Sequence, residues 1–128
     1  MKKEVGLWID HKRAVIVTIS GDSELITNLA SNVERNDRDI PASLDVAPED
    51  QQDRRFMDHL SKYYDEVISH IRDAMSILIL GPGEAKGEFA KQLKKEGLGA
   101  CIVGVETADK MTDRQIAAIV RQHYQPKH

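Results

Sequence analysis

One segment of the sequence has residue types that suit the binding of an anion. An apolar run ends at Gly81, the turn Gly81-Pro82-Gly83 follows at once, and Lys86 comes three residues later in a helical pattern. A glycine turn between a buried strand and a helix presents backbone N–H groups at the positive end of the helix dipole. Such a turn could hold a phosphate or an RNA backbone, with the flexible side chain of Lys86 reaching back toward it.

The same segment also permits a purely structural interpretation. It does not match the G-x-x-x-x-G-K-[ST] pattern of a phosphate-binding P-loop. Glu84 would place a carboxylate in the first helical turn, where it satisfies the helix dipole itself and repels phosphate. The glycines are then present because a tight strand-to-helix turn needs their backbone freedom. Both interpretations, an anion cradle and a plain turn, remain open.

Further cations follow the glycine turn on the same predicted helix, and two more lie in an earlier turn. Together they could form a basic patch for an RNA backbone, whereas residues 31–75 are net acidic. The alternative is a solvated helix face, partly neutralised by Glu84, Glu88 and Glu96. The predicted anion- or RNA-binding set comprises Gly81, Gly83, Lys86, Lys91, Lys94, Lys95, Lys12 and Arg13.

Carboxylates suggest a second chemistry, metal-dependent cleavage of a phosphodiester. Such a nuclease holds two metal ions about 4 Å apart with several acids from strand ends and a helix. Asp10, after the first predicted strand, and Glu66, on a long predicted helix, are the candidate ligands. The fourth predicted strand carries no acid, so the set is incomplete, and Asp10 could instead stabilise a hairpin turn. We therefore predict no catalytic residue, no metal and no other cofactor.

Turn residues and apolar periodicity predict the elements that would position these side chains. Strands are expected at residues 5–9, 14–19 and 24–30, with a hairpin at 10–13, and further strands at 76–80 and 100–105. A long helix is expected from about 51 to 74, a second from Pro82 to about 96, and a third after the capping box Thr112-Asp113-Arg114-Gln115. Residues 31–50 are polar, contain two prolines and predict a long loop.

This β-β-β-α-β-α-β-α order predicts an α/β fold with a mixed five-stranded sheet, in the ribonuclease H-like arrangement. The two later strands are almost wholly apolar, as parallel strands covered on both faces are, so helices are expected on both faces. The 128 residues predict a single domain, 1–128. The residues expected to be buried are Leu7, Ile9, Ile16, Leu60, Ile77, Ile79, Phe89, Ile102, Val103 and Ile119.

Two segments resemble a known family. Residues 77–89, ILILGPGEAKGEF, resemble the strand-GPG-x-x-K-x-x-F-helix segment in the middle domain of Pelota and of the archaeal and eukaryotic peptide-chain release factors. Residues 7–17, LWIDHKRAVIV, resemble the first hairpin of that domain, and small bacterial proteins labelled translational machinery proteins are also similar. The resemblance implies a middle domain that works at the ribosome or on RNA. The chain lacks the Gly-Gly-Gln tripeptide of release factors, so release-factor activity is not implied.

Composition sets the remaining expectations. The formal net charge of −3 gives no overall basic field, so any contact with RNA depends on a local patch. The single Cys101 excludes an internal disulfide and suits a reducing cytosol, and no signal peptide or membrane-spanning run is apparent. We therefore expect a cytoplasmic, non-catalytic, translation-associated module that docks on the ribosome or on RNA. The alternative is a divergent metal-dependent nuclease or another phosphate-handling enzyme of ribonuclease H-like fold.

Overall fold

The structure, a computed structural model, describes residues 3–31 and 49–124, with side chains in the first long helix described from residue 58 onward. One five-stranded sheet has the order β3-β2-β1-β4-β5. Strands β1 (Lys3–Ile9), β2 (Arg13–Ser20) and β3 (Ser23–Ala30) form an antiparallel meander. Their turns are short, as the polar breaks in the sequence predicted. The predicted loop at 31–50 lies almost wholly outside the described residues.

The second half of the chain adds two parallel strands. Strand β4 (Ser76–Gly81) pairs with β1, and β5 (Ile102–Thr107) pairs with β4. Helix α2 (Glu49–Ser69) precedes β4. Helix α3 (Ala85–Lys95) and the short 3₁₀ turn η1 (Gly99–Cys101) connect β4 to β5, and helix α4 (Asp113–Tyr124) follows β5. The predicted element order and the mixed sheet are therefore confirmed.

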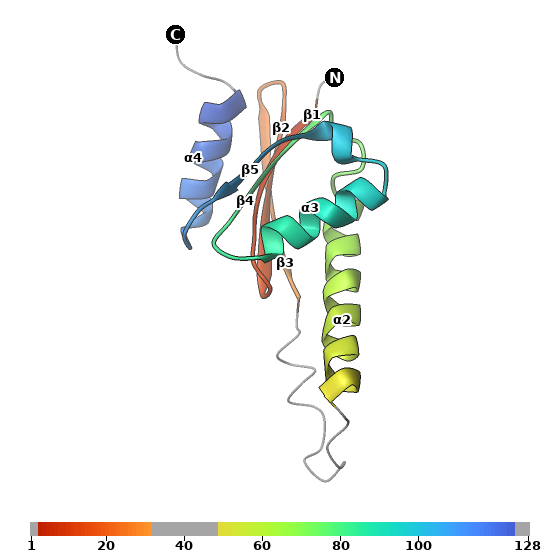
Figure 1. Ribbon diagram of the computed structural model, residues 1–128. Coiled ribbons are helices and arrows are strands. Elements are labelled where there is room, and N and C mark those ends of the chain that lie inside the picture. The colour runs from red at the N-terminus through yellow and green to blue at the C-terminus, as the bar shows by residue number, and fades with distance from the viewer. Residues whose placement is uncertain (1–2, 32–48, 125–128) are drawn as a thin grey trace.

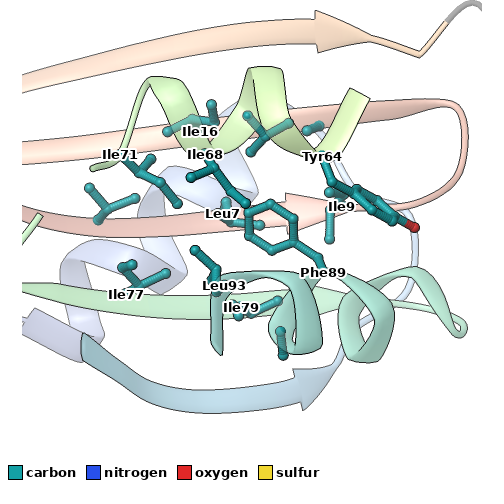
Figure 2. Packing of buried hydrophobic residues seen from close by; sticks show 14 of the residues in the cluster. Leu7, Ile9, Ile16, Tyr64, Ile68, Ile71, Ile77, Ile79, Phe89 and Leu93 are labelled. Atoms are coloured by element: carbon teal, nitrogen blue, oxygen red, sulfur yellow. The ribbon is translucent and has the colours of Figure 1, made fainter. Parts of the chain in front are cut away.

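Helices cover both faces of the sheet (Figure 1), as the apolar parallel strands predicted. Helices α2 and α3 pack on one face, where Phe89 lies among Leu7, Ile68 and Leu93 (Figure 2). Helix α4 packs on the other face through Ile116 and Val120. The apolar stripe of α2 is buried where it is described, at Leu60, Tyr63, Tyr64, Val67, Ile68 and Ile71.

The capping box of α4 is also confirmed. The backbone N–H of Thr112 donates to Gln115 Oε1 at 2.9 Å, and the backbone N–H of Gln115 donates to Thr112 Oγ1 at 3.2 Å. Ile116 is buried, and Met111 packs against the same cluster, as a hydrophobic staple requires. Gly97, with φ +82, ends α3 in the left-handed conformation that favours glycine.

Several predicted boundaries are wrong, and three of the ten residues predicted to be buried are not fully buried. Helix α2 ends at Ser69 rather than near 74, because the chain tightens into i→i−3 turns at His70 and Ile71. Strand β5 begins at Ile102 because η1 occupies the preceding residues. Val103 is 49% exposed rather than buried, because an irregularity in the β4–β5 register displaces it from the sheet pattern. Ile102 and Ile119 are half-buried, and the other residues predicted to be buried are buried.

Among residues 3–31 and 49–124, no helix is both long enough and apolar enough to cross a bilayer.

Candidate anion-binding site at the carboxyl edge of the sheet

Three connections that carry candidate residues meet at one edge of the sheet. Because β1, β4 and β5 are parallel, their carboxyl ends lie together. The β1–β2 turn, the Gly81–Gly83 turn and the segment after β5 therefore meet there. In open α/β sheets, ligands bind in the crevice outside the carboxyl ends of the strands. The candidate residues of the two turns thus lie at the edge of the sheet where ligands are expected.

Asp10 organises the β1–β2 turn. Its Oδ1 accepts the backbone N–H of Lys12 at 2.8 Å and that of Arg13 at 2.7 Å, while its own N–H donates to the carbonyl of Arg13. A carboxylate that accepts two backbone N–H groups fixes a tight turn. These contacts match the turn-stabilising interpretation of Asp10 from the sequence.

Replacing Asp10 is expected to destabilise the fold. Asp10→Ala removes two hydrogen bonds to a charged acceptor and should lower the free energy of unfolding by roughly 2 kcal/mol, measured by urea denaturation. Asp22, exposed in the β2–β3 turn, supplies the control, so Asp22→Ala should change stability by less than about 0.5 kcal/mol. Equal costs for the two variants would contradict the turn-fixing role.

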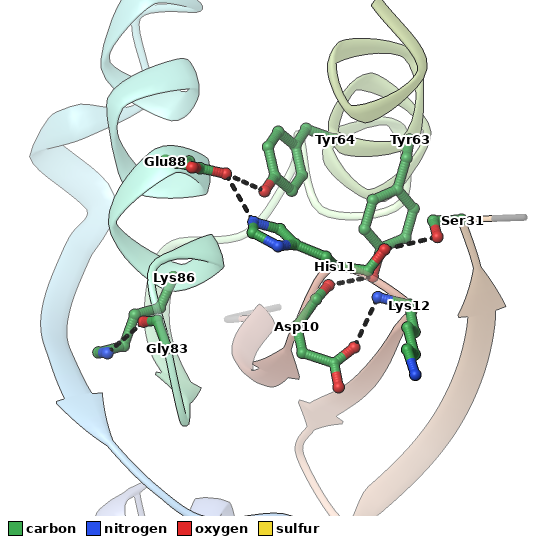
Figure 3. Close-up of polar contacts among 9 residues, drawn as sticks. All are labelled: Asp10, His11, Lys12, Ser31, Tyr63, Tyr64, Gly83, Lys86 and Glu88. Carbon is green, nitrogen blue, oxygen red and sulfur yellow. Dashed lines mark hydrogen bonds and ion pairs between the residues drawn. The ribbon is translucent and has the colours of Figure 1, made fainter. Parts of the chain in front are cut away.

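A polar network joins the β1–β2 turn to both helices on the α2–α3 side (Figure 3). His11 Nε2 lies 2.9 Å from Glu88 Oε1, and the hydroxyl of Tyr64 donates to the same oxygen at 2.7 Å. The hydroxyl of Tyr63 donates to the carbonyl of Asp10 at 3.1 Å. The network fixes the turn against α2 and α3, so its residues are held rigidly beside the glycine turn.

Both tyrosines of this network remain protonated at physiological pH. Burial raises the pKa of Tyr63 well above its usual range, with a further contribution from the charge of Asp10. Burial also raises the pKa of Tyr64, and the hydrogen bond to Glu88 adds to it. The hydroxyls therefore act as hydrogen-bond donors, a structural role, and not as bases.

At Gly81 the backbones of β1 and β4 approach each other closely. A Cβ atom at Gly81 would lie 2.3 Å from the carbonyl oxygen of Ile9 in β1, whereas one at Gly83 would meet no atom within 4 Å. Neither glycine has a positive φ, so their predicted role in supplying unusual dihedrals is wrong. Gly81 is needed because β1 and β4 approach closely here, and Gly83 lies in open space.

Helix α3 begins later than the sequence predicted. Pro82 is not its first residue; Glu84 occupies the N-cap position, and its carbonyl accepts the N–H groups of Gly87 and Glu88. Lys86 Nζ donates to the carbonyl of Gly83 at 2.5 Å, so the ammonium group lies directly beside the turn (Figure 3). The turn therefore carries one cation and the exposed carboxylate of Glu84.

The four lysines of α3 extend from the carboxyl edge along the helix. Lys86 is half-buried next to the turn, and Lys91, Lys94 and Lys95 are exposed on the outward side. At 1.5 Å rise per residue, about 13 Å of helix separates Lys86 from Lys95. Lys12 is exposed on the β1–β2 turn at the same sheet edge. Lys12 and Lys86 therefore lie at the carboxyl edge, and Lys91, Lys94 and Lys95 continue along α3 away from it.

Arg13 lies on the opposite side of the sheet. Its guanidinium carbon is 5.0 Å from the ring centroid of Trp8, which belongs to the cluster under α4, and the guanidinium donates to the carbonyl of Met111. The indole N–H of Trp8 in turn donates to the carbonyls of Ala108 and Asp109. Arg13 thus links the segment after β5 to the β1–β2 turn. The structure does not bring Arg13 beside the lysines of α3.

The two candidate metal ligands, Asp10 and Glu66, lie in different surroundings. Asp10 is engaged with the β1–β2 turn, and Glu66 is exposed on α2. In the described part of the chain, no three His, Cys, Asp or Glu side chains are grouped as ligands of one metal ion would be.

Sequence reasoning missed the role of Glu88 and of the two tyrosine hydroxyls. Helical periodicity treats Tyr63 and Tyr64 only as apolar residues of the long helix. The charge pattern treats Glu88 only as a carboxylate that neutralises lysines. One usable signal was present: buried tyrosines require a partner for their hydroxyl, which predicts a polar group opposite the stripe.

Comparison with known proteins identifies the fold. No family model matches the sequence, and no curated protein matches it. A solved structure of the Pelota protein from Thermoplasma acidophilum matches with a TM-score of 0.62 and 19% identity, covering 94% of this chain and 32% of that one. This chain has the fold of the Pelota middle domain.

Two further structures agree with the Pelota middle-domain fold. Pelota from Archaeoglobus fulgidus matches with a TM-score of 0.58 and 15% identity over 94% of this chain. An archaeal translation termination factor, aRF1, matches with a TM-score of 0.54 and 12% identity over 96% of this chain. The chain spans 31% of the former and 39% of the latter. The resemblance found in the two sequence segments is therefore confirmed at the level of the fold.

Proposed function

We propose that the protein is a non-catalytic, translation-associated module that docks on RNA, in particular the RNA of the ribosome. The observation that carries the proposal is the placement of Lys12 and Lys86 at the carboxyl edge of a Pelota-like domain, with the exposed Lys91, Lys94 and Lys95 continuing along α3 away from that edge. A polyanionic backbone is recognised by several such cations rather than by one pocket. A linear array of lysines therefore suits an extended polyanion better than it suits a small ligand.

Two of the three neighbouring acids are engaged by other side chains, whereas Glu84 stays exposed beside the turn. Glu88 is held by His11 and Tyr64, and Glu96 is 3.3 Å from Arg72. Lys91, Lys94 and Lys95 make no ion pair with any residue in the described ranges, so their ammonium groups are available to phosphates. The similarity to a protein described as a translation termination factor supports the ribosome as the source of the RNA.

The proposal predicts a salt-sensitive association that depends on these lysines. Full-length protein should co-sediment with ribosomes at low salt, and changing all four lysines of α3 to Gln should weaken binding roughly ten-fold or more and flatten its salt dependence. A matched control removes four cations elsewhere, by changing Lys62, Lys110, Arg114 and Arg121 to Gln, and leaves the Arg72–Glu96 ion pair intact. The control should bind nearly as the wild type does.

Equal loss in both quadruple variants would mean that total charge, not this array, controls association. No association of the wild-type protein with ribosomes or RNA at low salt would refute the proposed function.

A further inference from the structure

Strand β5 offers an unpaired edge on the side of the sheet away from β3. It is the terminal strand, and within the described ranges no other strand pairs with its outer edge (Figure 1). Such an edge presents backbone N–H and C=O groups that can pair with another extended chain. Proteins usually protect such edges with charges, proline or bulges, and β5 has one charged residue, Glu106, no proline, and one irregularity at Val103. The register irregularity affects only Val103, so Gly104–Thr107 form a regular edge.

A depression lies beside this edge, on the α3 side. It has a volume of about 500 Å³ and is lined by Gly83, Glu84, Lys86, Gly87, Glu88, Lys91 and Val105. Val105 pairs with the buried Ile79, so its side chain lies on the α3 face of the sheet, where it remains 43% exposed. Gly87 leaves open space where a side chain would be. An edge strand and a helix thus flank a hollow that contains an exposed apolar side chain.

We propose that β5 and this depression form a docking groove for an extended segment of a partner protein, which adds to the sheet as a sixth strand. Strand addition draws affinity from backbone hydrogen bonds and specificity from the pockets that receive alternate side chains. An apolar side chain of the segment would cover Val105 and fill the space at Gly87. This site is separate from the proposed docking on RNA, although the two surfaces share Lys86 and Lys91.

The charges around the depression select acidic residues in the segment. Glu88 is turned toward His11 and Tyr64 (Figure 3), which leaves Glu84 as the other carboxylate of the lining against Lys86 and Lys91. Glu106 pairs with Leu80 of the opposite cluster, so its side chain is on the far face. The segment that fits has apolar and acidic side chains at successive positions of the one face that it turns toward α3, so they lie two residues apart in its sequence.

The same charges disfavour a second copy of this chain as the occupant. Antiparallel pairing of two β5 strands about a two-fold axis places both copies of α3 on the same face of the joined sheet. The lysines of the two copies would then face each other, and like charges across an interface weaken it.

Synthetic peptides test the groove directly on the full-length chain. Three fluorescein-labelled eight-residue peptides are compared by fluorescence polarisation: the Val–Glu peptide, with the repeat Val-Thr-Glu-Thr, which puts Val and Glu on one face; the Val–Lys peptide, with Lys in place of Glu; and the Val–Glu peptide with N-methyl groups on alternate residues. We expect saturable binding of the Val–Glu peptide alone, because N-methylation removes the donors that strand addition uses. This comparison needs no variant of the protein.

Variants then locate the site. Val105→Lys should weaken binding of the Val–Glu peptide roughly ten-fold, because an apolar contact of about one side chain is lost. Leu25→Lys, at an exposed apolar residue on the other edge strand, should leave binding unchanged. Lys91→Glu should shift the preference toward the Val–Lys peptide.

Four outcomes would overturn the groove: no peptide binding, equal binding of all three peptides, insensitivity to Val105→Lys, or self-association in analytical ultracentrifugation that Val105→Lys abolishes. The two proposals fail independently. Changing Lys94 and Lys95 to Gln should weaken binding of RNA and not of peptide, whereas Val105→Lys should weaken binding of peptide and not of RNA.

Discussion

Phe89→Ala is expected to lower the free energy of unfolding by roughly 3–5 kcal/mol, measured by urea denaturation. The side chain is 0% exposed and lies between α2, α3 and the sheet (Figure 2). Its ring meets that of Tyr64 edge-on, with centroids 5.8 Å apart. Because neighbours from α2, α3 and the sheet define this space, they cannot collapse together to fill the cavity, and the cost should fall in the upper range for a buried aromatic residue.

Two other variants separate cavity formation from a general effect of mutation. Phe89→Leu keeps most of the buried volume and should cost about 1.5 kcal/mol. Leu25→Ala, at an exposed side chain, should change stability by less than about 0.5 kcal/mol. A cost below about 1 kcal/mol for Phe89→Ala would show that α3 does not complete the core as described.

The position of Phe89 was predictable because helical periodicity reports directly on which side of a helix is buried. The same reasoning found the stripe of α2 and the capping box at Thr112, since each depends on residues three or four apart. The mixed sheet with helices on both faces followed from the apolar parallel strands and from the handedness of crossovers. Local patterns thus predicted which elements form and that the sheet they build is mixed.

The features that escaped prediction depend on contacts between distant residues. The exposure of Val103 results from the register between β4 and β5, which the apolar pattern of β5 alone does not encode. The link between His11 and Glu88 joins residues 77 positions apart. Helix α3 begins at Ala85 and not Pro82 because the chain must first leave the sheet and reach the helix layer, about 10 Å away.

The candidate site was predicted in part. The carboxyl edge and the shared location of Lys12 and Lys86 follow from the parallel pairing of β1 and β4. Arg13, in contrast, was grouped with the lysines by its position in the sequence. Strand alternation places it on the same face as Val15 and Val17, beside Trp8 and under α4. The side chain of a strand residue is therefore better assigned by alternation than by proximity in sequence.

Gly81→Ala should be strongly destabilising, whereas Gly83→Ala, two residues away, should be tolerated. A Cβ at Gly81 would lie 2.3 Å from the carbonyl oxygen of Ile9, a backbone atom in a central strand that cannot move without disturbing β1. The carbonyl of Gly81 also accepts the N–H of Ala108 at 2.8 Å, so a shift of β4 would break a second contact. We expect the free energy of unfolding, measured by urea denaturation, to fall by about 3 kcal/mol, which is the upper end of the range for overpacking.

Gly83→Ala introduces the same methyl group into open space at a residue without a positive φ, so its free energy of unfolding should stay within about 0.5 kcal/mol of the wild type. Equal costs for the two variants, or a stable Gly81→Ala protein, would contradict the close approach of β1 and β4. Because Gly83→Ala keeps the fold, its association with ribosomes can be measured without interference from unfolding. Weakened association would place the anion at the turn itself, and unchanged association would leave the lysines of α3 as the contact.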